Sequence, residues 1–280
     1  MKIMKSREEL QSFVRRAQAE GKSIGLVPTM GYLHEGHLSL MKKAREENDI
    51  VIVSDFVNPI QFGPNEDYES YPRDLERDVE LAQSAGVDVV FAPTAEEMYP
   101  SHYATFVEVE GLTDHLCGAQ RPGHFRGVCT VVMKLFHLSK ATRAYFGKKD
   151  IQQLMILRRM AEDMNMDIEL VGMPIVREDD GLAKSSRNKY LSEAQRKDAL
   201  VLSRALKTAE EMIQGGEVRA SKLYEEMKNI IESVPCTVDY IKIVDCETLK
   251  DTDSVEKPSV IALAVRFGTT RLIDNMTVGF

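Results

Sequence analysis

Short apolar runs alternate with amphipathic segments along the first two thirds of the chain. The runs predict strands at about residues 23–28, 49–54, 87–91, 106–109, 144–146 and 168–171. The segments between them have helical periodicity, at about 6–19, 36–47, 73–85, 124–138 and from 150 onward. The unbroken run at 50–53 is typical of a strand buried on both faces of a parallel sheet. The alternation predicts an α/β fold with a doubly wound, Rossmann-like parallel sheet that binds ligands at the carboxyl ends of its strands.

The pattern changes after Arg177. Two helices are expected at 193–214 and 217–233, separated by Gly215 and Gly216, and two strands follow at about 238–245 and 259–267. This order is typical of an α+β arrangement. We therefore expect residues 1–176 to form a Rossmann-like, nucleotide-binding domain and residues 177–280 to form a smaller C-terminal α+β lid domain.

Composition narrows the class of protein. The net charge of −8 disfavours general binding to nucleic acid, which usually needs a basic face. The four cysteines form no CxxC pair, which disfavours a structural zinc site and a disulfide scaffold. The chain shows neither an apolar targeting segment at its start nor an apolar run near membrane-spanning length. These features predict a cytoplasmic enzyme with small-molecule partners, without nucleic acid or membrane.

Candidate chemistry begins directly after the first buried strand. Residues 28–37 read PTMGYLHEGH, a glycine-punctuated turn that opens a helix with His34 and His37 at its start. A helix N-terminus presents unpaired backbone N–H groups and the positive end of the helix dipole, so it attracts phosphate. By itself the pair fits two surface histidines equally well. A zinc site is a weaker interpretation, because two ligands do not complete one.

Other stretches with polar or basic residues follow predicted strands or begin predicted helices. They are FVNPIQF (56–62), RPGHFRG (121–127), YFGKKDIQQ (145–153) and DGLAKSSRN (180–188). The third is a second helix start suited to phosphate, without Walker A spacing. Taken singly, each also fits an ordinary turn, a helix cap or a flexible linker.

Taken together, six motifs remove this ambiguity. They are PTMGYLHEGH, FVNPIQFGPNEDYESYPRD, RPGHFRGV, YFGKKDIQQL, PIVREDDGLAKSSRN and RLIDN. In this order, over essentially the whole chain, the sequence resembles the pantothenate synthetases (pantoate–β-alanine ligases) of the HIGH-type nucleotidylyltransferase superfamily. The resemblance implies that ATP, (R)-pantoate and β-alanine give pantothenate, AMP and pyrophosphate through a pantoyl adenylate. It also implies a homodimer.

The resemblance further assigns roles to residues. It implies that His34, His37 and Lys149 are catalytic, with His37 as the proton donor. Gln61 and Gln153 are expected to bind pantoate, and Gln61 to lie near β-alanine as well. Mg²⁺ is expected on the phosphates, with Asp78 as a candidate contact. The expected ATP-binding residues are Met30, Gly31, Tyr32, Leu33, His34, Glu35, Gly36, His37, Gly147, Lys148, Lys149, Asp150, Val176, Lys184, Ser185, Ser186 and Arg187.

The chain departs from the family pattern at three positions. Lys148 stands where many members have glutamate, and Lys184 where many have methionine or leucine. Asp55 replaces an apolar residue within a predicted strand, where an unpaired buried carboxylate would be costly. We therefore expect Asp55 to have a local partner or to face solvent. The alternative functions are another nucleotidylyltransferase of the superfamily and a catalytically silent nucleotide-binding module.

Overall fold

The computed structural model describes residues 1–64 and 66–279, and the chain divides into two compact units. The N-terminal unit comprises Met1–Thr113 and Cys117–Pro174, and the C-terminal unit comprises Asp114–Leu116 and Ile175–Phe280. The main division thus lies close to the boundary predicted between residues 176 and 177.

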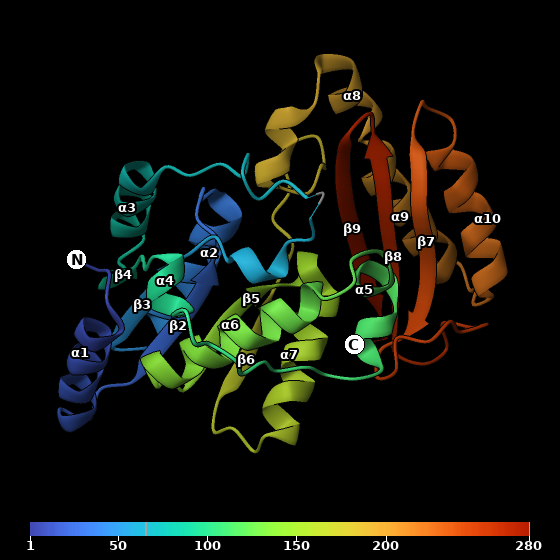
Figure 1. The fold of residues 1–280 in the computed structure, drawn as a ribbon. Helices are drawn as coiled ribbons and strands as arrows, with labels where there is room; N and C mark the ends of the chain where they lie inside the picture. Colours follow the sequence, from blue (N-terminus) through green and yellow to red (C-terminus); the bar gives the residue numbers. More distant parts are fainter. Residues whose placement is uncertain (65, 280) are drawn as a thin grey trace. The chain divides into compact units, whose positions relative to one another are not determined.

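A six-stranded parallel sheet forms the centre of the N-terminal unit (Figure 1). Its order is β1-β4-β3-β2-β5-β6. The strands are β1 (Lys2–Met4), β2 (Ile24–Thr29), β3 (Ile50–Asp55), β4 (Val89–Phe91), β5 (Arg143–Gly147) and β6 (Glu169–Met173). The strand order reverses between β2 and β5, and in such sheets the crevice at that reversal is where ligands bind. The predicted doubly wound fold is confirmed.

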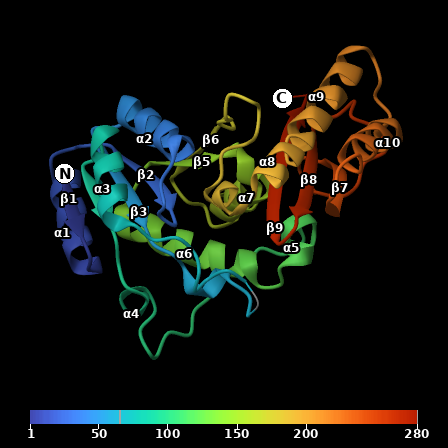
Figure 2. The ribbon, with the colours of Figure 1, turned by 90° about the horizontal axis from the view of Figure 1, so that it is seen from above.

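Helices cover both faces of this sheet. In chain order, the helices that precede β6 are α1 (Arg7–Ala19), α2 (Glu35–Glu47), α3 (Leu75–Ser84), α4 (Ala95–Met98), α5 (Leu116–Gln120), α6 (His124–Ser139) and α7 (Ile151–Asp163), with 3₁₀ turns η1 (Pro59–Gln61), η2 (Leu112–Asp114) and η3 (Lys148–Asp150). Helices α2 and α6 both contact β2, from opposite sides of the sheet (Figure 2). Ser6 and Glu9 form both hydrogen bonds of the predicted capping box that starts α1. Val27, Val51 and Met41 are fully buried where α2 packs on the strands.

The C-terminal unit contains an antiparallel three-stranded sheet in the order β7-β8-β9. Its elements are η4 (Ser186–Tyr190), α8 (Glu193–Asp198), α9 (Val201–Gln214), α10 (Ala220–Ile231), β7 (Thr237–Asp245), β8 (Ser259–Phe267) and β9 (Thr270–Val278). Helices α9 and α10 pack on each other and on this sheet. Leu223, Leu263 and Phe267 are fully buried in the resulting core.

Three sequence predictions differ from the structure. The strand predicted at 106–109 is wrong: the structure describes all four residues and gives them no strand, because the N–H of Val107 donates to the Thr130 hydroxyl at 3.0 Å rather than to a neighbouring strand. The single helix predicted at 193–214 is divided into α8 and α9 at Ala199 and Leu200, where Leu200 bonds back only three residues, to Lys197. Strands β1 and β9 were not predicted.

In the part of the chain that the structure covers, no helix combines the length and the apolar character needed to span a membrane.

Candidate active site

The two histidines of the first motif lie at the start of α2, directly after the central strand β2. Their ring centroids are 4.1 Å apart. Nδ1 of His34 accepts the N–H of Gly36 at 3.1 Å, and Nδ1 of His37 accepts the N–H of His34 at 3.3 Å. Since each Nδ1 accepts, each neutral ring carries its hydrogen on Nε2. Both histidines can therefore donate a hydrogen bond from Nε2.

His37 is neutral at physiological pH. Burial, followed by the electrostatic effects of His34 and Lys149, lowers the pKa of His37 to about 3. Lys149 lies in η3, at the carboxyl end of β5, so it acts on His37 across the point where the strand order reverses. This geometry combines the Nε2 donors of His34 and His37 with the cation of Lys149, a set suited to anionic phosphate oxygens.

A buried carboxylate holds the turn before α2 in place. Asp78 is 1% exposed, and its two oxygens accept the N–H of Tyr32 at 2.5 Å and of Leu33 at 2.7 Å. Gly31 and Tyr32 both have positive φ, of 75° and 51°. At Gly31 a Cβ would lie 2.3 Å from Oδ1 of Asp55, so only glycine fits this turn.

Asp55 ends β3 beneath the same turn. Its partner is the Asp78 carboxyl, and burial together with the charge of Asp78 raises the pKa of Asp55 to about 7. Its Oδ2 is buried without a hydrogen-bond partner among residues 1–64 and 66–279. The expected local partner is thus a second acid, and it serves only one oxygen of Asp55, because the other stays unpaired among the described residues. Two carboxyls in this position share a proton more readily than they both ionise.

The Gln61 side chain is held from several directions. It is 7% exposed, and its Nε2 lies 3.0 Å from the sulfur of Met30. Its Oε1 accepts from Nδ2 of Asn58 at 3.0 Å, and the hydroxyl of Tyr99 donates to Oδ1 of Asn58 at 2.8 Å. Gln61 thus contacts a residue of the predicted ATP site, which brings two predicted groups of residues together.

The RPGHF motif supports the backbone of Gln61. Nδ1 of His124 donates to the carbonyl of Gln61 at 2.8 Å, while Nε2 lies 3.0 Å from Nη1 of Arg121. Arg121 in turn pairs with Glu66, with Nε 2.7 Å from Oε1. Burial and Arg121 lower the pKa of His124 to about 4, which keeps the ring neutral. The motif therefore positions the backbone of Gln61, a residue predicted to bind pantoate.

Gln153 and Gln152 have different environments. Gln152 is 5% exposed, donates to the carbonyl of Leu112 at 3.0 Å and accepts the N–H of Cys117 at 2.9 Å. Gln153 is less buried, and its amide makes no hydrogen bond within the described chain. Only Gln153 is thus available to a ligand, as the prediction requires.

The predicted phosphate-binding segment 184–187 belongs to the C-terminal unit. Lys184 N–H donates to the carbonyl of Val176 at 2.9 Å, and Ser185 caps η4 by accepting the N–H of Arg187 at 3.3 Å. Arg177 precedes this segment in the chain. Its guanidinium donates to both carboxylate oxygens of Asp274, at 2.7 and 2.9 Å. Asp274 belongs to the RLIDN motif in β9 and is 2% exposed. This motif therefore braces the segment.

A family model for pantoate-beta-alanine ligase matches residues 2–277. The chain belongs to the pantoate–β-alanine ligase family. The pantothenate synthetase of Fervidobacterium nodosum is 56% identical over 278 residues, 99% of each chain. The crystal structure of the Thermus thermophilus pantothenate synthetase matches with a TM-score of 0.94 at 50% identity, covering 99% of both chains. The Francisella tularensis ligase, solved with beta-gamma ATP and beta-alanine, matches with a TM-score of 0.82 at 37% identity, covering 99% of this chain and 97% of that chain.

Pantoate–β-alanine ligases form pantothenate in an ATP-dependent reaction, and this chain is an enzyme of that class. For such a ligase, the donors around His37 and Lys149 suit the triphosphate, and the neutral amide of Gln61 suits an uncharged part of a substrate beside it.

Asp78, the candidate metal contact, holds the backbone of the turn before α2 instead. Both oxygens of Asp78 are occupied by backbone N–H groups, and no three His, Cys, Asp or Glu side chains of the described residues could hold a metal ion. The residues present therefore do not fit a magnesium ion held by Asp78.

The sequence analysis missed Asn58, Tyr99 and His124 as supports of Gln61. Asn58 and His124 lay in motifs that were noticed but interpreted as turn and cap residues. Their partners are up to 69 residues away in the sequence, so local spacing could not reveal the contacts.

Proposed function

We propose that this ligase condenses (R)-pantoate with β-alanine, using ATP to activate pantoate as pantoyl adenylate and releasing AMP and pyrophosphate. The observation that carries the proposal is the histidine pair at the start of α2, with Nε2 donors directed away from the bonded Nδ1 atoms and Lys149 acting on the same ring. A nucleotide site next to Gln61 is what this reaction needs.

In the first step a carboxylate oxygen of pantoate attacks the α-phosphorus of ATP, and the bond to the bridging oxygen of pyrophosphate breaks. Negative charge grows on the phosphate oxygens as that bond breaks. His34 and His37 donate hydrogen bonds from Nε2 to these oxygens, and Lys149 adds a positive charge. Because His37 starts neutral, it stabilises the charge as a hydrogen-bond donor. The ring becomes protonated, and able to transfer a proton, only when the negative charge of the triphosphate raises its pKa.

In the second step the amine of β-alanine attacks the acyl carbonyl carbon, and the carbon–oxygen bond to AMP breaks. The amides of Gln61 and Gln153 hold the pantoate hydroxyls without placing another charge beside the reacting carboxyl. Positioning is the main requirement, since the adenylate is already activated.

Further parts of the proposal rest on the family resemblance. Val176, Lys184, Ser185, Ser186 and Arg187 bind the nucleotide from the C-terminal unit, which serves as a lid. Magnesium would neutralise charge on the ATP phosphates. Since the described carboxylates do not fit a protein-held ion, no step above depends on it. The enzyme is proposed to be a cytoplasmic homodimer.

The test is to incubate the protein with ATP, omitting pantoate or β-alanine in turn, and to measure AMP and pyrophosphate. We expect AMP release only when both acids are present. Pyrophosphate release without β-alanine-dependent AMP would favour a different nucleotidylyltransferase. No turnover at all would favour a nucleotide-binding module.

Replacing His37 tests its assigned role. We expect His37→Ala to lower kcat for adenylate formation by about 10²–10³-fold, because an oxyanion donor is removed at the phosphates. Circular dichroism should show an intact fold, since His37 is only partly buried. A kcat near that of the wild type would show that His37 does not take part.

A further inference from the structure

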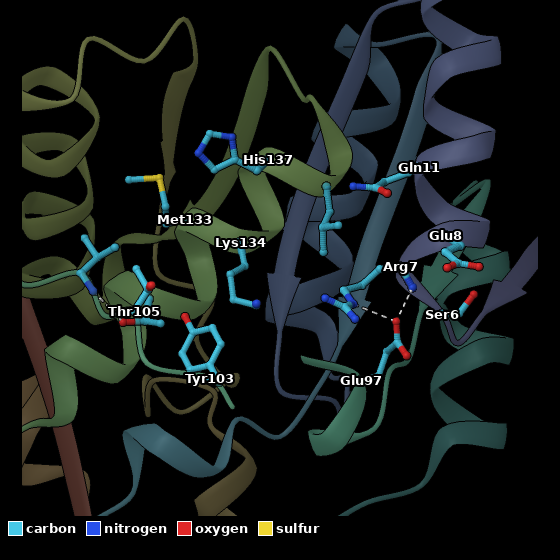
Figure 3. Close-up of a pocket in the computed structure, with 13 residues that line it drawn as sticks. Ser6, Arg7, Glu8, Gln11, Glu97, Tyr103, Thr105, Met133, Lys134 and His137 are labelled. Carbon is cyan, nitrogen blue, oxygen red and sulfur yellow. Dashed lines mark hydrogen bonds and ion pairs between the residues drawn. The ribbon is translucent and has the colours of Figure 1, made fainter. Parts of the chain in front are cut away.

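A cavity lies in the N-terminal unit along one face of α6 (Figure 3). It has a volume of about 790 Å³. Its walls come from the start of α1, from Glu97 in α4, from the segment 103–107 and from one face of α6. None of the residues predicted to bind ATP, pantoate or β-alanine lines it. It is large enough for a small organic molecule.

Lys134 supplies the charge of this cavity. Its ammonium lies 4.6 Å from the ring centroid of Tyr103 and 5.6 Å from that of Tyr99. Among the described residues it has no carboxylate partner, and burial together with the charge of Arg7 lowers its pKa. Figure 3 shows Lys134, Tyr103 and Arg7 around the same space. A cation held only by aromatic faces retains most of its capacity to bind an anion.

The other charges at the cavity are compensated or distant. Arg7 pairs with Glu97, with Nε 2.9 Å from Oε1, and its backbone N–H donates to the same oxygen at 2.8 Å. Glu8 is exposed and lies in Figure 3 beside Ser6, at the opposite side from Lys134. Among the described residues, Lys134 is thus a cavity cation without a carboxylate contact, and the exposed Glu8 carboxylate lies at the other side of the same cavity.

Neutral donors and apolar side chains complete the lining. The donors without a hydrogen bond to any described residue are Gln11, Tyr103 and His137. Burial raises the pKa of Tyr103, which keeps its hydroxyl protonated and able to donate. The apolar surface comes from Val107, Met133 and Leu138. Uncommitted donors above an apolar floor are typical of small-molecule sites.

We propose that this cavity binds a small monocarboxylic acid with an apolar body. The carboxylate pairs with Lys134 and accepts from the Tyr103 hydroxyl, and the apolar part packs on Met133 and Leu138. One negative charge matches the cation of Lys134. A dianion such as a phosphate ester would leave a charge facing Glu97, so a monoanion is favoured.

The test is calorimetric titration of the full chain with benzoate, in which the lysine variants below distinguish binding in this cavity from binding in the proposed substrate site. We expect benzoate to bind the wild type and to bind Lys134→Gln about tenfold more weakly, because a charge-assisted contact is lost. Lys140→Gln removes the same charge from the end of the same helix, outside the cavity, and should bind as the wild type does. Benzamide, which lacks the charge, should bind more weakly than benzoate.

Several results would overturn the proposal. Equal binding by the two lysine variants, or phenyl phosphate binding more tightly than benzoate, would contradict it. So would a change of sedimentation in Lys134→Gln with benzoate affinity unchanged, which would show that a second copy covers the cavity. Should that variant not fold, Tyr103→Phe provides the second test, with an expected loss of about threefold. Because benzoate binding is measured without turnover, it does not depend on whether the proposed reaction occurs.

Discussion

Two acids, Asp55 and Asp78, meet beneath the turn that carries His34, and only Asp78 has backbone donors to hold its charge. This difference between the two carboxyls indicates which of them carries the shared proton. Asp78 accepts two N–H groups, which favour its charged form, whereas Asp55 has a buried oxygen without a partner. Burial raises the pKa of Asp78 as well, but Asp55 is the member of the pair that holds a proton up to about pH 7 and can then donate to Asp78.

This assignment predicts a pH dependence of stability. The pKa of Asp55 is about 7 in the folded protein, against an ordinary value of 3.8. The protonated Asp55 side chain therefore contributes its full stabilisation of the fold below pH 3.8, and this contribution is lost as the pH rises through 7. Relative to Asp55→Asn, the free energy of unfolding of the wild type should fall by about 1–2 kcal/mol from about pH 5 to about pH 8. Urea unfolding at both pH values measures it.

Asp49→Asn is the matched control. Hydrogen bonds from Ser23 lower the pKa of Asp49, so its charge does not change over this range and its variant should show no such fall. A wild type and an Asp55→Asn variant with parallel pH profiles would show that Asp55 is ionised throughout.

At the scale of elements, the close approach of α6 to η1 fixes where Gln61 lies. Gly127 permits this approach, because a Cβ there would lie 2.4 Å from the carbonyl oxygen of Ile60 and 2.6 Å from Cα of Gln61. Nδ2 of Asn58 also reaches the carbonyl of Gly127, at 3.1 Å. Helix and turn are thus joined at one small residue.

Gly127→Ala should therefore displace Gln61. We expect a loss of about 1–3 kcal/mol in the free energy of unfolding, as for other overpacked sites, together with a higher KM for pantoate. At Gly63 the nearest atom to an added Cβ is 3.7 Å away, so Gly63→Ala is the control. Measurements of the pantoate KM and of thermal unfolding in both variants test this prediction. Unchanged values for Gly127→Ala would mean that η1 adjusts freely.

Elements with a strong local signal could be predicted from the sequence. The Ser6 and Glu9 capping box and the apolar run 50–53 were enough to place α1 and β3. The segment 106–109 has a similar pattern, but a strand needs a partner, and the pattern does not contain one. Strand β9 was missed because its RLIDN residues were interpreted as a motif, although Asp274 also serves as a strand residue that holds Arg177.

In the candidate site, too, only the features with a local sequence signal could be predicted. The histidine turn lies within ten residues, so its sequence showed it directly. The residues that support the site are distant in the sequence. Asp78 is 46 residues from Tyr32, whose N–H it accepts, and His124 is 63 residues from Gln61, to whose carbonyl it donates. The family resemblance offered Asp78 as a candidate Mg²⁺ contact, whereas the structure gives its carboxylate two backbone N–H partners distant in sequence.

At the scale of the whole molecule, we proposed from the family resemblance that the C-terminal unit takes part in binding ATP. Arg187→Ala changes only the C-terminal unit, yet it should weaken equilibrium binding of a non-hydrolysable ATP analogue by about tenfold, because a charged contact to phosphate is lost. Arg204→Ala, on α9 of the same unit, is the control and should leave binding unchanged. Equal ATP affinity in the Arg187 variant and the wild type would confine the nucleotide site to the N-terminal unit.

The central claim is that the carboxylate of pantoate becomes linked to AMP at the start of α2. Pantoate labelled with ¹⁸O in its carboxylate tests it most directly, with mass spectrometry of the AMP and pyrophosphate after turnover with ATP and β-alanine. One labelled oxygen bridges carbon and phosphorus in the adenylate and stays on phosphorus when the amine attacks carbon. The account predicts one ¹⁸O in AMP and none in pyrophosphate. Unlabelled AMP, or label in pyrophosphate, would contradict it.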